Sequence, residues 1–258
     1  MDTLMEFDAR KARFDRICRE AMRERHTMGD AGIGTLCEKR MHAVIKRYIC
    51  EDQDCHEVGI VGTRYVSDVR IGNDAYEVQT GAFYPMRKKI AYYLEHTDMT
   101  VTVVHPVSIV KWLCWIDPQS KEISPRKRVA RTERREDLLA ELYSLLPYLG
   151  NPRLKFRLLL LETQDFRIKE SSASGRNKGT KYERVPISLL GEECFFEPRD
   201  FASLVPTELC GSFTVKQFSN ATKLRGRDAY SAVRVLCALG LLAEAAPIGR
   251  AMAFVKTF

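Results

Sequence analysis

Apolar positions near the start of the chain recur with the period of an α-helix. Within 4–26 they are Leu4, Phe7, Phe14, Ile17 and Cys18. Charged residues fill most of the remaining positions, which predicts an amphipathic helix. A glycine-rich stretch over 29–34 interrupts this pattern. A second helix is expected over 35–48.

The pattern changes after residue 56, where β-branched and aromatic residues dominate. Strands are expected at about 57–62, 64–71, 75–80, 100–106 and 109–116. Gly72-Asn73-Asp74 has the composition of a hairpin turn between the second and third of these strands. The helical pattern returns at about 83–95, so the expected order is helix, three strands, helix, strand, strand.

The second half of the chain begins with a basic connection, SPRKRVARTERRED, over 124–137. A helix should follow over 137–149 and end at Gly150-Asn151-Pro152. Residues 154–168 are expected to form a long strand or a strand pair. The small and polar residues of 171–181 predict a loop or a hairpin tip.

The sequence of the last segment, 201–258, predicts two short helices, a tight turn at Arg225-Gly226-Arg227, a third helix and a short hairpin. In this order of elements the segment resembles a winged helix-turn-helix domain. Asp228 is the expected N-cap of the third helix. Its expected core face comprises Tyr230, Val233, Leu236, Cys237 and Leu239.

Such a domain implies a DNA-binding surface at the start of its third helix. The candidate DNA-binding residues are Lys223, Arg225, Arg227, Ser231, Arg234 and Arg250. The alternative is a winged helix that serves protein contact, including a homodimer.

The overall composition fits this view. The chain has 258 residues, enough for two domains, and its net charge of +7 favours a polyanionic partner such as DNA. Its eight cysteines are scattered and contain no Cys-x-x-Cys pair, which favours a reducing compartment. The charged N-terminus is atypical of a signal peptide, and no apolar run reaches the length of a membrane span. We therefore expect a cytoplasmic protein without a membrane partner.

The candidate chemistry lies in an acidic hairpin. Glu77 and Gln79 are two residues apart in one strand and should share a face. Asp68 is on the preceding strand, close to cross-strand register with Glu77. Two adjacent carboxylates repel each other, and a hard cation such as Mg²⁺ or Mn²⁺ would relieve the repulsion. Bound Mg²⁺ would also polarise a phosphate and activate water.

In residues and in order of elements, segment 35–116 resembles the PD-(D/E)XK nuclease superfamily. The resemblance implies a restriction-endonuclease-like mixed α/β sheet flanked by helices, with Asp68 and Glu77 as metal ligands. The acid of the preceding helix would be Glu38. The sequence departs from the family at Gln79, where the motif has lysine. Lys88 or Lys89 on the following helix would then supply the missing charge.

Other interpretations of these residues stay open. Asp68 and Glu77 would otherwise be solvated acids on a sheet, and Glu38 a surface residue paired with His42. Glu57 competes as a ligand, and Lys88 and Lys89 would otherwise be solvated. The expected domains are a nuclease-like unit over 1–130, a connection over 131–200 and the winged helix over 201–258. The expected function is a Mg²⁺-dependent DNA endonuclease, and the alternatives are an inactive nuclease-like DNA-binding regulator and a protein-interaction scaffold.

Overall fold

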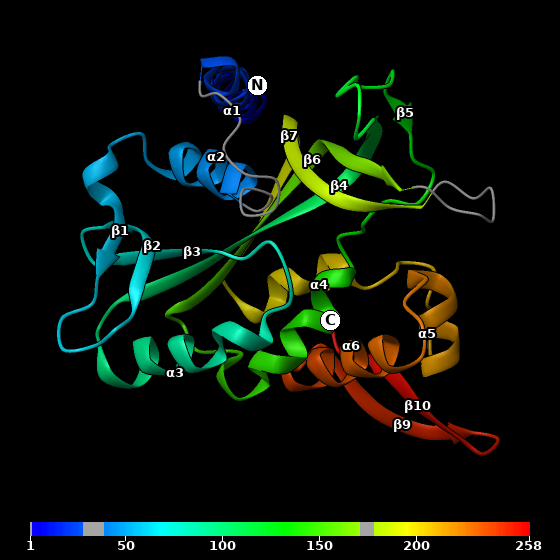
Figure 1. Cartoon of the computed structure of the whole chain (residues 1–258). Helices are drawn as coiled ribbons and strands as arrows, with labels where there is room; N and C mark the ends of the chain where they lie inside the picture. The colour runs from blue at the N-terminus through cyan, green and yellow to red at the C-terminus, as the bar shows by residue number, and fades with distance from the viewer. Residues whose placement is uncertain (1, 28–38, 171–177) are drawn as a thin grey trace.

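The computed structural model of the chain describes residues 2–27, 39–170 and 178–258 (Figure 1). Its α-helices are α1 (Asp2–Thr27), α2 (Lys39–Ile49), α3 (Arg87–His96), α4 (Asp137–Leu142), α5 (Val215–Thr222) and α6 (Arg227–Ala238). Its strands are β1 (His56–Gly59), β2 (Val66–Ile71), β3 (Asp74–Val78), β4 (Thr100–Ile116), β5 (Lys127–Arg128), β6 (Leu154–Glu170), β7 (Lys178–Phe195), β8 (Phe213–Thr214), β9 (Leu242–Ile248) and β10 (Ala251–Lys256). Short 3-10 helices are η1 (Gln53–Cys55), η2 (Tyr84–Met86), η3 (Tyr143–Tyr148) and η4 (Pro198–Leu204). Glu38 lies outside the described residues.

Seven of the described strands form one mixed sheet in the order β1-β2-β3-β4-β6-β7, with β5 paired to β4. The predicted meander is present as the antiparallel pairs β1–β2 and β2–β3. Gly72 makes the β2–β3 turn at a φ of 60°, a left-handed conformation that glycine adopts without steric cost. The mixed α/β fold expected from the sequence is thereby confirmed.

The strand β4 lies at the centre of this sheet. It runs parallel to β3, with Glu77 opposite Val103, because α3 provides the crossover between them. The sequence predicts two strands here, but β4 is continuous and has a bulge between Ser108 and Val110. Pro106 is tolerated because its missing N–H faces an edge where β3 has already ended and β5 has not begun.

The sequence does not predict β7. This strand pairs antiparallel with β6 along most of its length, so the long strand predicted over 154–168 is half of an extended hairpin. Only the tip of the hairpin, over 171–177, lies outside the described residues.

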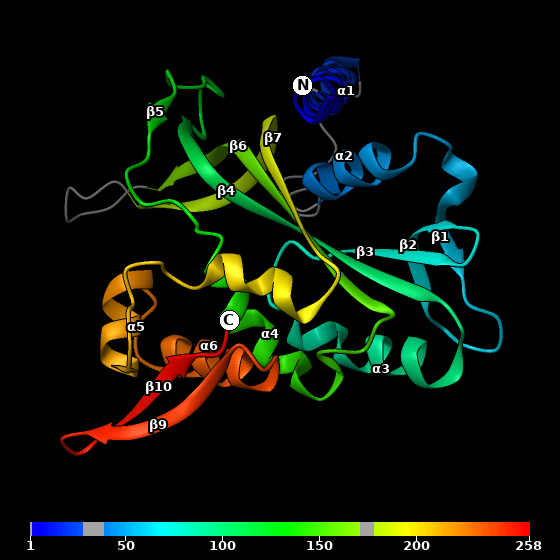
Figure 2. The same ribbon diagram turned by 180° about the vertical axis from the view of Figure 1, so that it is seen from behind.

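Helices cover both faces of the sheet (Figures 1 and 2). On one face, α1 and α2 bury Phe14, Ile17 and Ile45 against apolar residues of β6 and β7. On the other face, α3 and α4 pack in a larger core that includes Ile90 and Leu139. The molecule is therefore built on one sheet with helices on both faces. The β1–β2–β3 meander at one end of this sheet contains the acidic hairpin. In the part of the chain that the structure describes, no helix has the length and apolar character that crossing a membrane requires.

The C-terminal segment has the predicted order of helix, turn, helix and hairpin. The helices α5 and α6 are followed by the β9–β10 hairpin, and β8 adds a third antiparallel strand. Thr214 caps α5 in a capping box with Gln217. The buried residues of α6 belong to the same core as those of α3 and α4. The domain boundaries proposed from the sequence stay predictions.

The face that α6 buries matches the predicted one at Val233, Leu236 and Leu239 and departs from it at Tyr230. Tyr230 is 51% exposed, whereas Ser231 is buried. The buried residues Ala229, Ala232, Val233 and Leu236 follow the spacing i, i+3, i+4, i+7 of a helix face. The prediction that Tyr230 faces the core was wrong, because an aromatic residue was assigned to the interior where an alanine completes the apolar stripe.

Candidate active site

Glu77 is a buried acid on the third strand of the meander. Its Oε2 accepts a hydrogen bond of 2.5 Å from the Lys89 ammonium, and its Oε1 accepts one of 2.7 Å from the Tyr93 hydroxyl. Both partners belong to α3, where residues four apart share one helix face. The helix that follows the acidic strand therefore supplies both hydrogen-bond donors to this carboxylate.

Burial has a measurable consequence for Glu77. Desolvation raises the pKa of its carboxyl to about 7, although the charge and hydrogen bond of Lys89 oppose the shift. The negative charge of Asp68 adds to the increase. An acid with a pKa near neutrality is typical of functional sites, where burial and neighbouring charges are combined.

Lys89 is held in its position by a second contact. Its ammonium donates a hydrogen bond of 2.6 Å to the carbonyl oxygen of Val66, at the start of β2. Tyr93 is fixed in a similar way, because its hydroxyl lies 2.8 Å from the Ser67 hydroxyl. Both side chains thus bridge α3 and the β2–β3 hairpin, and their geometry is set by packed secondary structure.

Asp68 occupies the neighbouring strand and has different partners. Its Oδ2 accepts a hydrogen bond of 2.7 Å from the Val78 amide and lies 3.1 Å from Nε2 of His42 on α2. Burial works to raise the pKa of Asp68, but His42, the Val78 amide and the charge of Lys89 lower it overall. Asp68 is therefore the more acidic member of the pair.

The two carboxylates lie at the end of the β2–β3 ladder. The backbone pairing reaches Val69 opposite Tyr76, and one residue further the Asp68 side chain receives the Val78 amide. The Asp68 charge acts on Glu77, while α2 holds Asp68 and α3 holds Glu77. The arrangement combines two acids and one lysine from three elements.

The remaining candidates of this region are more dispersed. The Gln79 amide donates 2.6 Å to the Ala82 carbonyl, so its side chain is bonded within the following turn. Lys88 is exposed. Glu57 is largely exposed and forms an ion pair with Lys46. Of Lys88 and Lys89, it is Lys89 that contacts Glu77.

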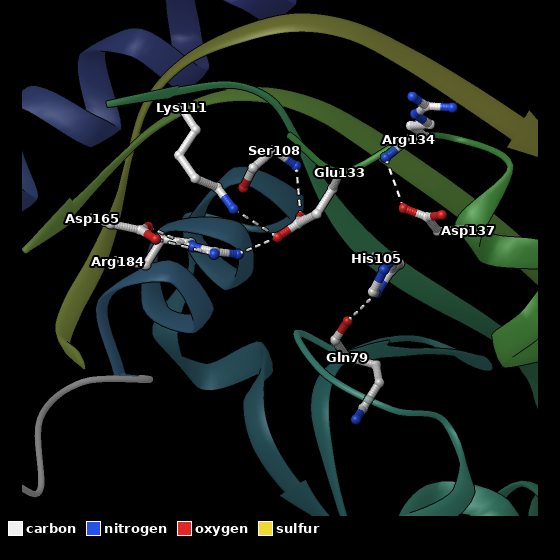
Figure 3. Close-up of polar contacts among 9 residues, drawn as sticks. All are labelled: Gln79, His105, Ser108, Lys111, Glu133, Arg134, Asp137, Asp165 and Arg184. Carbon is white, nitrogen blue, oxygen red and sulfur yellow. Dashed lines mark hydrogen bonds and ion pairs between the residues drawn. The ribbon is translucent and has the colours of Figure 1, made fainter. Parts of the chain in front are cut away.

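An open depression of about 500 Å³ lies where β3 ends. It is lined by His42, Val78, Gln79, Thr80, Gly81, Ala82 and Pro85. Beside it, His105 of β4 lies with Nδ1 at 2.5 Å from the Gln79 carbonyl, as Figure 3 shows. Burial lowers the pKa of His105, so this histidine is neutral at pH 7 and holds the turn.

Asp68 and Glu77 are the candidate metal donors of this site. In 2–27, 39–170 and 178–258, no group of three or more His, Cys, Asp and Glu side chains is arranged to hold a metal ion. Mg²⁺ commonly uses only one or two protein carboxylates and keeps several waters. The mutual repulsion of Asp68 and Glu77 is the kind that a divalent cation relieves. Asp68 and Glu77 supply oxygen donors of the kind that Mg²⁺ and Mn²⁺ prefer.

The sequence pointed to both acids and to Lys89, but it missed three of the side chains that hold the site together. His42 contacts Asp68, and Tyr93 contacts both Glu77 and Ser67. For Tyr93 a signal existed, because it lies four residues after Lys89 and follows it on the same helix face. For His42 the pairing with Asp68 depends on how α2 lies over the sheet, which periodicity does not reveal.

The candidate DNA-binding residues lie on the C-terminal unit. Arg225, Arg227, Arg234 and Arg250 are exposed, and the Lys223 ammonium donates to the Asn220 carbonyl at the end of α5. Ser231 is buried, so its hydroxyl is not offered to a ligand on this surface. The exposed Tyr230 lies one position before it, between the arginines of α6.

Comparison with known proteins adds a family but no activity. No curated protein and no solved structure matches the chain. One family model, described as a domain of unknown function, matches residues 39–196. This range contains the complete seven-stranded sheet and all the site residues from His42 to Tyr93. Because the match covers more than half of the 258 residues, the chain belongs to the family of the domain of unknown function DUF8091.

Proposed function

We propose that the protein is a metal-dependent endonuclease that hydrolyses phosphodiester bonds in DNA. The observation that carries the proposal is the 2.5 Å ion pair between Lys89 and Glu77. In the PD-(D/E)XK pattern a lysine follows the acid by two positions in the strand, and here that position holds Gln79. Lys89 brings an ammonium group to the same acid from the next helix.

The order of the elements also supports the proposal. The antiparallel meander β1–β2–β3 is followed by α3 and by β4 parallel to β3. This is the order that the resemblance to PD-(D/E)XK nucleases implies, with Asp68 on the second strand and Glu77 on the third. Fold similarity alone does not establish an activity, so the side chains carry the weight of the proposal.

Asp68 and Glu77 would hold the Mg²⁺ or Mn²⁺ ion through their carboxylate oxygens. When bound, the ion would polarise the phosphoryl group and lower the pKa of a coordinated water. The protein would contribute the geometry of its acids. His42 keeps Asp68 ionised and oriented, and the Tyr93 hydroxyl orients Glu77.

Lys89 would stabilise negative charge that develops on the phosphate. It is suited to this role because it is held by the Val66 carbonyl and by Glu77 in a mostly buried position. A preorganised cation in a site of low dielectric stabilises charge more strongly than one in water. Gln79, bonded to Ala82, would line the approach through the depression at the end of β3.

A cleavage assay tests the proposal. Linear, nicked, branched and single-stranded DNA, with RNA of matched sequence, would be incubated with Mg²⁺, Mn²⁺ or EDTA. We expect metal-dependent cleavage of at least one DNA substrate and its loss in Glu77→Ala and Asp68→Ala. Failure to cut any DNA with either metal, or unchanged cleavage by Glu77→Ala, would overturn the proposal.

A second function is favoured by one specific observation. Both oxygens of Glu77 already accept hydrogen bonds from protein groups, and Gln79 leaves the motif without its own lysine. A protein with this network closed would be an inactive nuclease-like DNA-binding regulator. It would bind duplex DNA with steep salt dependence and cleave none of the substrates above.

A further inference from the structure

A basic ribbon follows the strand β4 along one edge. We define the basic ribbon as residues 125–131, which contain Arg126, Lys127, Arg128 and Arg131. All four of these side chains are exposed. Arg126 stacks over the Trp112 ring at 4.5 Å from its centroid. Within the described residues, Lys127, Arg128 and Arg131 have no acidic partner, so their charges face solvent unneutralised.

The basic ribbon shares an edge of β4 with the candidate active site. The strand β6 occupies one edge of β4 from Val101 to Ile116. On the other edge β3 pairs with 100–104, and β5, which lies in the ribbon, pairs with Trp112 and Leu113. Because a strand has only two edges, the acidic strand and the basic ribbon lie one after the other along the same edge.

The spacing along this edge can be estimated from the register. Glu77 is opposite Val103, and Arg128 is opposite Trp112. At a strand rise of about 3.3 Å per residue the two positions are separated by roughly 30 Å. Duplex DNA rises about 3.4 Å per base pair, so the interval corresponds to roughly nine base pairs.

A partly buried network of charged residues anchors the basic ribbon to the sheet (Figure 3). Glu133, just beyond the basic ribbon, accepts a hydrogen bond of 2.6 Å from Arg184 and one of 2.9 Å from the Ser108 amide. Arg184 in turn binds both oxygens of Asp165, at 2.7 and 3.2 Å. The Val129 amide donates 2.9 Å to the Lys111 carbonyl. The exposed cations therefore extend from a fixed backbone.

The segment after the basic ribbon joins it to the winged helix. Arg134 donates 3.0 Å to the Thr222 carbonyl at the end of α5, and Arg135 donates 2.7 Å to the Ser203 carbonyl. Thr222 immediately precedes the turn that carries Lys223 and Arg225. These two hydrogen bonds attach the segment after the basic ribbon to the C-terminal unit.

We infer that the basic ribbon is a binding site for the phosphate backbone of duplex DNA. The inference rests on the proposed function, because it assigns the duplex a path from the winged helix along β4 toward Glu77. Cations without acidic partners on a fixed strand edge match a regular row of phosphates, and each contact formed releases counterions. Such contacts position a duplex and do not read its sequence.

The test measures binding to a fluorescein-labelled 30-base-pair duplex by anisotropy, in EDTA, between 50 and 300 mM NaCl. The ribbon variant is Lys127→Ala/Arg128→Ala. We expect weaker binding and a shallower dependence on salt. The magnitude of the slope of log K against log salt should fall by up to about 1.8, because each lost phosphate contact lowers it by about 0.9. The control is Arg13→Ala/Arg16→Ala, which removes two cations of α1 that are already paired with Glu51. It should keep the wild-type slope.

An unchanged slope in the ribbon variant, an equal decrease in the control, or no binding of the duplex at 50 mM NaCl would overturn the inference. Melting temperatures of both variants identify any loss of folding, and Lys127→Gln/Arg128→Gln then repeats the charge removal with longer side chains. The outcome is separable from that of the cleavage assay. If the ribbon variant lowers the salt dependence of binding but the protein cleaves no DNA, the binding site is supported and the endonuclease proposal is rejected. If the protein cleaves DNA but the ribbon variant keeps the wild-type salt dependence, the endonuclease proposal is supported and the binding site is rejected.

Discussion

Glu77 carries a charge in surroundings that oppose it. Its carboxylate is buried next to Asp68, and Lys89 compensates only part of the unfavourable energy. Active sites commonly hold such conflicts, because groups arranged for function are not arranged for stability. The conflict at Glu77 therefore has a consequence that is measurable without substrate or metal.

We predict that Glu77→Gln in EDTA becomes more stable relative to wild type as the pH rises. The folded-state pKa of about 7 exceeds the ordinary value of 4.5, so between these values the folded protein binds more protons than the unfolded chain. Stability contributed by the protonated acid is complete below pH 4.5 and is lost as the pH rises through 7. Over this window wild type should lose roughly 3 kcal/mol relative to the variant.

Urea unfolding of both proteins at pH 5 and pH 8 provides the measurement. A difference in unfolding free energy that does not change between the two pH values would contradict the raised pKa of Glu77. Gln has nearly the shape of Glu and keeps one of the two acceptors that bind Lys89 and Tyr93. The cost of the lost acceptor is the same at both pH values, so it cancels in the comparison.

At the scale of elements, hydrophobic periodicity predicted most helices and strands. The meander, α3, β4, β6 and the C-terminal helices follow from periods of 3.6 and 2. The errors occurred where long-range pairing decides. The prediction divided β4 between 106 and 109, whereas the strand is continuous because β6 pairs with it across this interval. The strand β7 depends on its pairing with β6. The acids of the site and the helix that supplies the lysine could be predicted from the sequence, but the contact of Asp68 with His42 of α2 could not.

The charge network between β4, β6 and β7 should contribute to the stability of the fold. Asp165 is 5% exposed and holds Arg184, which in turn holds Glu133. Asp165→Ala should cost about 3 kcal/mol, because it leaves a largely buried guanidinium without its bidentate partner. Urea unfolding measures the loss. Glu51→Ala, which removes an exposed ion-pair partner of α1, should change stability little, and an equal loss in both variants would argue against a structural role of the network.

At the scale of the whole molecule, the sheet and the C-terminal unit share a core. Leu236 of α6 belongs to the same cluster of buried residues as Leu139 of α4 and Val103 of β4. The sequence indicated two domains by a change of pattern, but it could not indicate whether their interiors are continuous. A shared core predicts that the two parts unfold together.

Tryptophan fluorescence can detect this coupling. Both tryptophans of the chain, Trp112 and Trp115, are in β4. Leu236→Ala should remove about 2–5 kcal/mol through loss of buried methyl groups and lower the urea midpoint of the tryptophan signal as well as that of the far-ultraviolet circular dichroism. A lower midpoint for the helical signal alone would mean that α6 and the sheet unfold independently.

If Lys89 supplies the charge that Gln79 lacks, removing Lys89 should affect DNA cleavage far more than removing its neighbour Lys88. Single-turnover DNA cleavage with Mg²⁺ would be measured for wild type, Lys89→Met and Lys88→Met. Lys88 is the adjacent exposed lysine, so the two variants lose the same charge from the same helix. The ion pair with Glu77 predicts a decrease of about 100- to 1000-fold for Lys89→Met and a rate close to wild type for Lys88→Met. Equal rates for the two variants would contradict the assignment of Lys89.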